Sequence, residues 1–257
     1  MANSRSGDSV VSRVVRVLDS FDSSRTSQTP AEIATRAGLP RSSAHRLVSD
    51  LVAQGLLERD DAGAIRIGMR LWELTTRGSH ALRLRQLALP FMEQVQAAVR
   101  EHTQLGVLER DEVLFIERIS DPNAGANVAR IAGRLPLHAS SSGLVLLAHS
   151  PAAAQERYLA GSMAPVSPET ITDPEQLRRK LSEVRRLGYA HAPGYIDVVS
   201  TGIAVPVSDA SGVIAALGVV VPRGTEAPDA MVAILRRAAA GIGAALTASP
   251  FASHSMG

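Results

Sequence analysis

The sequence contains no cysteine, which excludes disulfide frameworks, thiol nucleophiles and metal sites built on cysteine. Its longest apolar run, 213–221, has nine residues, far fewer than the roughly 18 that a membrane-spanning helix needs. The first residues also lack the apolar segment of a secretory signal peptide. We therefore expect a cytoplasmic protein with no membrane partner.

Lysine and aromatic residues are scarce. Lys180 is the single lysine among 27 basic residues, and aromatic residues make up 3% of the 257-residue chain. Hydrophobic residues make up 45%, which excludes a disordered chain and suits one large or two smaller domains. Residues 1–80 hold eleven arginines against nine acidic residues, and the charges balance in the remainder. The net charge of +2 therefore lies in the first third, which favours a polyanionic partner without identifying one.

Motifs for catalysis and metal binding are missing. The seven histidines show neither of the H-x-x-x-H and H-E-x-x-H spacings that place two ligands on one helix face. The serines at 140–142 do not stand in the G-x-S-x-G pattern of a nucleophile elbow. We expect no metal, no cofactor and no enzymatic activity.

Residues 10–67 have the pattern of a compact helical unit that ends in a hairpin. Apolar spacing and breakers predict three helices and two strands, at 10–21, 30–37, 40–54, 56–59 and 64–67. A short helix joined to a longer one through a glycine turn is typical of a helix-turn-helix motif. The hairpin, turning at 60–63, then corresponds to a wing.

The start of the second helix carries a capping signature. Thr29 suits the N-cap, Pro30 suits the first helical position and Glu32 completes a capping box. Gly38 is a good C-terminal stop, and Pro40 opens the third helix. These signals predict a turn of only a few residues between the two helices.

The third helix has two stripes at helical spacing. The apolar stripe contains Ala44, Leu47, Val48 and Leu51. The polar stripe, on the opposite side, contains Ser42, His45, Arg46 and Ser49. The apolar stripe would dock the helix on its neighbours and leave the polar stripe free for the major groove of DNA.

The rest of the chain mixes helices with antiparallel strand pairs. A helix at 69–77 would connect two domains, and Pro90 predicts a kink or break in the next helix, at 79–101. Further strands are expected at 103–110, 112–120, 126–131 and in a hairpin over 203–222, and helices at about 173–187 and 228–247. Thr172 or Asp173 would cap the first of these helices, and Gly188 would end it. The fold class is therefore α+β.

Several segments carry a family resemblance. They are the helical unit from 12 to 60, "GRLPLHASSSGLVLLA" at 133–148, "QLRRKLSEVRRLGY" at 176–189 and "IAVPVSDASGVIAALGV" at 203–219. The chain resembles the IclR family of bacterial transcription regulators over about residues 10–246. The resemblance implies a winged helix-turn-helix domain at 1–68, a linker helix at 69–80 and a GAF-like effector-binding domain at 81–257. It also implies homodimers or homotetramers on palindrome-like operators of double-stranded DNA.

The resemblance places the base-reading helix on residues that the polar stripe largely shares. Arginine is the usual bidentate reader of guanine, and helix N-termini favour phosphate contacts. The wing arginines are candidates for contacts to the DNA backbone or the minor groove. The predicted DNA-binding residues are Thr29, Arg41, Ser42, Ser43, His45, Arg46, Arg59 and Arg66.

For the effector, the resemblance implies a pocket between the sheet, the "LPLHA" helix start and the last two strands. Family members commonly carry acidic residues, a cysteine and serines where this chain has Ala192, Pro193, Gly202, Gly218 and Val220. Such apolar replacements favour an aromatic or largely apolar carboxylate over glyoxylate or pyruvate, with its charged end at the 140–142 helix start. The predicted effector-binding residues are Leu135, His138, Ala139, Ser140, Ser141, Ser142, Ala192, Gly202, Gly218 and Val220.

Three interpretations stay open at this point. The first is a ligand-responsive repressor of a catabolic operon. The second is an effector-independent DNA binder whose pocket is vestigial. The third, a catalytically active second domain, would need a nucleophile–base pair or a metal cluster, and the sequence offers neither.

Overall fold

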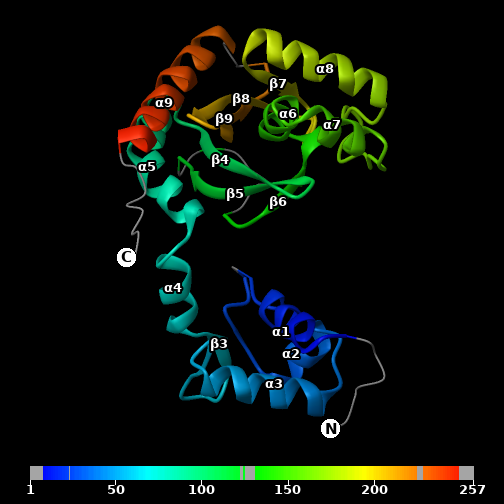
Figure 1. Ribbon diagram of the computed structural model, residues 1–257, viewed down its shortest axis with the longest axis vertical. Coiled ribbons are helices and arrows are strands. Elements are labelled where there is room, and N and C mark those ends of the chain that lie inside the picture. The colour runs from blue at the N-terminus through cyan, green and yellow to red at the C-terminus, as the bar shows by residue number, and fades with distance from the viewer. Residues whose placement is uncertain (1–7, 23, 122–123, 125–130, 225–227, 249–257) are drawn as a thin grey trace, which may run out of the picture. The chain divides into compact units, whose positions relative to one another are not determined.

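The computed structural model describes residues 8–22, 24–121, 124, 131–224 and 228–248. The chain divides into two compact units, residues 1–80 and 81–257. Helices and antiparallel strands occur in both units (Figure 1), and this confirms the predicted two-domain α+β fold class.

The first unit combines four helices with a small three-stranded sheet of order β1-β3-β2. Its helices are α1 (Val10–Asp19), α2 (Pro30–Arg36), α3 (Arg41–Ala53) and α4 (Met69–Thr76), and its strands are β1 (Ser27–Gln28), β2 (Leu57–Arg59) and β3 (Ile65–Ile67). The short strand β1, in a segment expected to be a loop, pairs antiparallel with β3.

Local hydrogen bonds set the boundaries of α2. The Thr29 hydroxyl accepts from the Glu32 amide at 3.3 Å, and a Glu32 carboxylate oxygen accepts from the Thr29 amide at 2.8 Å, which completes the predicted capping box. Gly38 ends the helix at φ +60°, where the Leu39 amide donates to the Ala34 carbonyl at 3.0 Å. Four residues, 37–40, therefore separate α2 from α3. The apolar side of α3 packs into the core of this unit with residues such as Val17, Ile33, Leu57 and Ile65.

The second unit is built on a six-stranded antiparallel sheet of order β6-β5-β4-β9-β8-β7. In chain order the strands are β4 (His102–Glu109), β5 (Glu112–Ile119), β6 (Arg134–Pro136), β7 (Ala190–Pro193), β8 (Ser200–Asp209) and β9 (Gly212–Pro222). The two longest, β8 and β9, form the hairpin predicted around residues 209–212.

Helices cover both faces of this sheet (Figure 1). One face packs against α5 (His80–Val99) and α9 (Pro228–Ala248). The other packs against the 3₁₀ turn η1 (Leu137–Ala139), α6 (Ser141–Ala148), α7 (Ala152–Leu159) and α8 (Pro174–Leu187). Each face therefore has its own apolar core.

By length and composition alone, α9 is long and apolar enough to cross a membrane. Its side chains Val232, Leu235 and Ile242 are buried in the core between α9, α5 and the sheet. The same helix carries Arg236 and Arg237 on its remaining surface. One face of α9 therefore belongs to the apolar core of the second unit.

The sequence predicts a kink or break at Pro90, and the structure excludes the break. α5 is continuous through Pro90. Leu84 and Ala88 before the proline and Met92 and Val95 after it are buried against the sheet, so packing stabilises the helix on both sides of Pro90. Pro90 itself is exposed, where water can reach the carbonyl that its missing N–H leaves unpaired.

Other boundaries near the second core also differ from expectation. The "LPLHA" segment at 135–139 was expected to begin a helix. It instead forms the end of strand β6 and the turn η1, and α6 begins only at Ser141. The expected loop after residue 189 is strand β7, which pairs with β8. The strand expected at 126–131 lies outside the described residues, apart from its last position.

Strand β5 contains one extra residue opposite β4. Leu105 lies opposite Glu117, whereas the next residue, Gly106, lies opposite Phe115, so Ile116 forms a bulge. Phe115 consequently faces α6, and Glu117 faces α5. The buried Glu117 carboxylate lies 2.7 Å from the guanidinium Nε of Arg85 on that helix.

Candidate functional site

The outer face of α3 carries two arginines and a histidine. Arg41, His45 and Arg46 are exposed, and within the described part of the chain none of them forms a hydrogen bond or an ion pair. Other arginines of this unit are neutralised, as in the Arg16–Asp8 pair at 2.5 Å and the Arg25–Asp22 pair at 3.1 Å. The free charges on α3 are thus available to an anionic partner.

The remaining predicted DNA-binding residues on α3 lie at its start. Ser42 is exposed, and Ser43 is partly buried in the first turn. Pro40 occupies the N-cap position without a side-chain hydrogen bond, so the first amides of α3 have no capping side chain. This end can therefore donate to a phosphate.

Three other predicted contacts have partners within the protein. The Thr29 hydroxyl donates to the Glu32 carboxylate at 2.8 Å as part of the capping box. Arg59 donates from Nη1 to the Gly63 carbonyl at 2.8 Å, and Arg66 pairs with Glu58 at 3.0 Å. Contacts of these groups with DNA would compete with bonds that already exist.

Glu58 connects the wing to α4. Its carboxylate accepts from the Met69 amide at 2.8 Å and from Arg66, and these two donors lower the pKa of Glu58 below its usual value. An ionised Glu58 therefore holds the wing strand β3 and the first turn of α4 together. The sequence pattern gave no indication of this contact.

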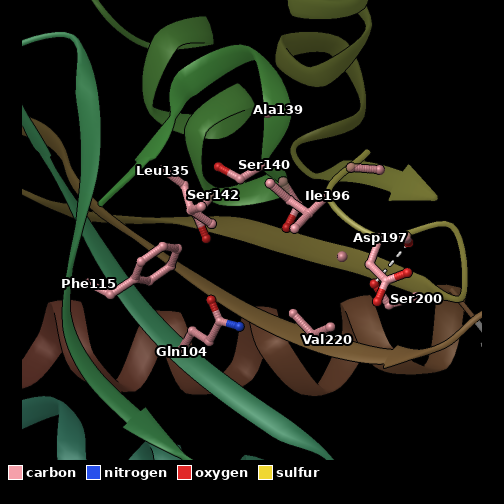
Figure 2. Close-up of a pocket in the computed structure, with 13 residues that line it drawn as sticks. Gln104, Phe115, Leu135, Ala139, Ser140, Ser142, Ile196, Asp197, Ser200 and Val220 are labelled. Atoms are coloured by element: carbon pink, nitrogen blue, oxygen red, sulfur yellow. Dashed lines mark hydrogen bonds between the residues drawn. The ribbon is translucent and has the colours of Figure 1, made fainter. Parts of the chain in front are cut away.

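In the second unit, a cavity of about 40 Å³ lies between the start of α6 and the sheet (Figure 2). It has room for about three water molecules. Eight of the ten predicted effector-binding residues line it: Leu135, Ala139, Ser140, Ser141, Ser142, Ala192, Gly202 and Val220. Sequence reasoning missed five further lining residues: Gln104, Phe115, Ile196, Asp197 and Ser200.

Two glycines let α6 approach the sheet closely. A Cβ atom added at Gly202 would lie 2.7 Å from the Ser141 hydroxyl. One added at Gly218 would lie 2.9 Å from the Ile203 carbonyl oxygen and 3.4 Å from the Ser142 hydroxyl. Gly218 does not line the cavity, but it allows the helix start to approach the floor of the pocket.

His138 is also absent from the cavity wall. Its Nε2 lies 3.0 Å from the Ala164 carbonyl, which only accepts, so Nε2 carries the proton. Its Nδ1, 2.7 Å from the Tyr158 hydroxyl, then accepts from that group. Burial lowers the pKa of His138, an effect that the bond to Ala164 partly opposes. With both ring nitrogens engaged, His138 anchors η1 to α7 and the following loop.

The cavity contains donors that have no partner. Within the described residues, the hydroxyls of Ser141 and Ser142 form no hydrogen bond, whereas the Ser140 hydroxyl caps α6 by accepting from the Gly143 amide at 3.1 Å. Gln104 is only 4% exposed, and its Nε2 has no partner. A buried amide without a partner is costly, and a ligand would supply the missing acceptor.

The sequence carried only a partial signal for Gln104, a polar residue inside the strand predicted at 103–110. Gln104 is a polar side chain in a strand whose neighbours Thr103 and Leu105 are also buried. Such a position needs a hydrogen-bond partner. Among the described residues, no group of three or more His, Asp or Glu side chains is placed to hold a metal ion.

A winged helix-turn-helix unit with free cations on its outer helix, joined to a second unit with a donor-lined pocket, defines a ligand-binding transcription factor. Family models for the IclR helix-turn-helix domain and for the C-terminal domain of bacterial IclR transcriptional regulators match residues 10–61 and 77–244. The chain therefore belongs to the IclR family of transcriptional regulators, which bind DNA and are not enzymes.

Individual relatives agree with this assignment. The chain is 31% identical over 210 residues to the HTH-type transcriptional regulator XynR of Escherichia coli, covering 80% of this chain and 83% of XynR. It is 28% identical over 184 residues to KipR of Bacillus subtilis, covering 71% and 74%. An IclR homolog from Microbacterium hydrocarbonoxydans, crystallised in complex with 4-hydroxybenzoate, is 56% identical, with a TM-score of 0.90 over 94% of this chain and all of that one.

Proposed function

We propose that this chain represses a catabolic operon and releases or rearranges on DNA when its pocket binds an aromatic carboxylate such as 4-hydroxybenzoate. The observation that carries the effector class is the cavity itself, in which unpartnered donors face apolar walls. The 4-hydroxybenzoate complex of a 56% identical homolog supports the same class.

In this proposal the ligand carboxylate meets the start of α6. The hydroxyls of Ser141 and Ser142 and the first helix amides donate to it, and the helix dipole adds a favourable potential. The aromatic ring lies against Phe115, Leu135 and Val220. Because the cavity is only about 40 Å³, binding requires these side chains to move apart.

In the DNA complex, α3 enters the major groove with Arg41 and Arg46 at base edges and Ser42 and Ser43 near phosphates. A homodimer or homotetramer would present two such helices to a palindrome-like operator in the cytoplasm. The ligand shifts the balance between operator-binding and other geometries only if it binds one of them more tightly.

Calorimetric titration of the full-length protein with 4-hydroxybenzoate, benzoate and glyoxylate tests the effector class. We expect the aromatic acids to bind and the two-carbon acid to bind far more weakly. At 100 times its Kd, a ligand adds about 2.7 kcal/mol of stability, which raises the melting temperature of a unit of this size by roughly 5–11 °C.

A second candidate function is an effector-independent DNA binder. The observation that favours it is the small apolar lining at Ala192, Gly202 and Val220, where family members carry polar groups. In that case no carboxylate would raise the melting temperature, and operator affinity would not respond to any of them.

For the DNA interface, Arg46→Ala should weaken operator binding by about 1–3 kcal/mol and relax base choice at one position. Arg25→Ala is the matched control, because it removes the same charge from the first unit but from a side chain already paired with Asp22. The measurement is fluorescence anisotropy with operator and scrambled DNA at fixed salt. Equal losses with both variants, or with both DNAs, would contradict base reading by Arg46.

A further inference from the structure

The pocket has two polar sides of opposite hydrogen-bonding character. On one side are donors, the Ser141 and Ser142 hydroxyls and the Gln104 side-chain amide. On another side is an acidic residue, Asp197, in the segment between β7 and β8. Figure 2 shows Asp197 beside Ser200, at the end of the pocket opposite Phe115.

Hydrogen bonds from neighbouring elements hold the segment that carries Asp197. Before it, the Gly194 carbonyl accepts from the Ser167 hydroxyl at 2.5 Å, and the Tyr195 carbonyl accepts from the Thr170 hydroxyl at 2.7 Å. After it, Arg223 donates to the Val198 carbonyl from its side chain at 3.3 Å and to the Val199 carbonyl from its backbone at 2.9 Å. The backbone is thus restrained on both sides of Asp197, so ligand binding carries little entropic cost for ordering this segment.

The carboxylate of Asp197 is only partly used by the protein. Oδ1 accepts from the Val199 amide at 3.2 Å, and within the described residues Oδ2 has no partner. A carboxylate is an acceptor without donors, so it repels the carboxylate of a ligand and accepts from a neutral hydroxyl. Hydrogen bonds from a hydroxyl to a charged acceptor are short and are stronger than neutral ones.

We propose that Asp197 accepts the ring hydroxyl of the ligand while Gln104 and the start of α6 hold its carboxylate. This inference rests on the proposed effector class and adds the position of the second polar group. A molecule that fits carries a carboxylate at one end of an aromatic ring and a hydroxyl at the other. The pocket then selects para-hydroxylated acids over unsubstituted ones and rejects aromatic dicarboxylates.

The test is a set of calorimetric titrations on the full-length protein with 4-hydroxybenzoate, benzoate and terephthalate. For the wild type we expect 4-hydroxybenzoate to bind roughly ten- to a hundredfold more tightly than benzoate, the range typical of one hydrogen bond to a charged group. Terephthalate should not bind. In Asp197→Ala the ratio of the Kd for benzoate to the Kd for 4-hydroxybenzoate should fall from roughly ten to a hundred to about one.

Asp197→Asn separates ligand contact from loop geometry. Its amide oxygen can still accept from the Val199 amide, so the turn is kept, but the negative charge is removed. We expect this variant to retain a reduced preference for the hydroxyl and to admit terephthalate. Equal weakening of 4-hydroxybenzoate and benzoate in both variants would overturn the inference, since Asp197 would then act through the loop.

The failure of this inference differs from the failure of the proposed function. If the wild type binds 4-hydroxybenzoate and benzoate equally well, the effector class stands and the role of Asp197 is wrong. If the wild type binds neither acid, both proposals are wrong.

Discussion

Replacing Gly143 with alanine should destabilise the second unit although alanine is the better helix former. A Cβ atom at this position would lie 2.7 Å from the carbonyl carbon of Leu137 and closer still to its oxygen. These atoms belong to the backbone of η1, so no side-chain rotation relieves the contact. Overpacking of this kind costs up to about 3 kcal/mol, and the helix propensity of alanine returns about 1 kcal/mol.

The expected net loss is about 2 kcal/mol, or roughly 4–8 °C in the melting temperature of a unit of this size. Thermal unfolding followed by circular dichroism measures it. Gly78→Ala is the matched control: a Cβ atom there meets nothing within 4 Å, and it should be neutral or stabilise by about 0.4–1 kcal/mol. If the Gly143→Ala variant has a melting temperature equal to or above that of the wild type, the packing argument is wrong.

The remaining predictions concern the capping box of α2 and the buried pair His138 and Tyr158. Thr29→Ala should cost about 1 kcal/mol of stability by removing the cap of α2. The Thr29 amide and hydroxyl lower the pKa of Glu32, so this carboxylate stabilises the fold above pH 4.5, and its contribution disappears as the pH falls through the lowered pKa. Urea unfolding between pH 6 and 3 should therefore show a steeper acid loss for the wild type than for Glu32→Gln. Tyr158→Phe should cost about 1–3 kcal/mol, because it leaves His138 Nδ1 buried without a donor. Burial lowers the pKa of His138, so stability in the wild type should also decline as the pH falls below about 6.5; an unchanged urea midpoint between pH 7.5 and 5.5 would argue against this.

Elements whose boundaries depend on nearby residues could be predicted from the sequence. α2 begins at the capping box of Thr29 and ends at Gly38, as expected. α8 begins after Asp173, whose side chain accepts from the Gln176 amide, and ends at Gly188 with φ +71°. In each case the signal and the structure it sets lie within a few residues of one another.

Elements that depend on distant partners could not be predicted in the same way. β1 has two residues and exists because Ser27 lies opposite Arg66, far along the chain. β7 was expected to be a loop because nothing local marks it as the partner of β8. α7 carries no strong cap, and Pro151 at its N-cap forms no side-chain hydrogen bond.

The pocket residues likewise divide into those marked by a local motif and those that depend on distant partners. Leu135 and the residues from Ala139 to Ser142 are neighbours in sequence, so one motif indicates them together. Gln104 and Phe115 reach the cavity only through the register of β4 and β5, in which Gln104 lies opposite Gly218 of β9. The position of Asp197 depends on hydrogen bonds from two other segments of the chain, the turn at Ser167 and Thr170 and the residue Arg223.

The bulge at Ile116 keeps an acidic side chain, that of Glu117, out of the pocket. In a regular strand, Glu117 would lie two residues beyond Phe115 on the same face and would bring a second acidic group to the site of an anionic ligand. The extra residue turns Glu117 to the other face, where it meets Arg85. When this strand is compared between relatives, the number of residues in it matters as well as their identity, because the bulge decides which face each side chain lies on. A relative with the same amino acids but a regular ladder would prefer a ligand of different charge.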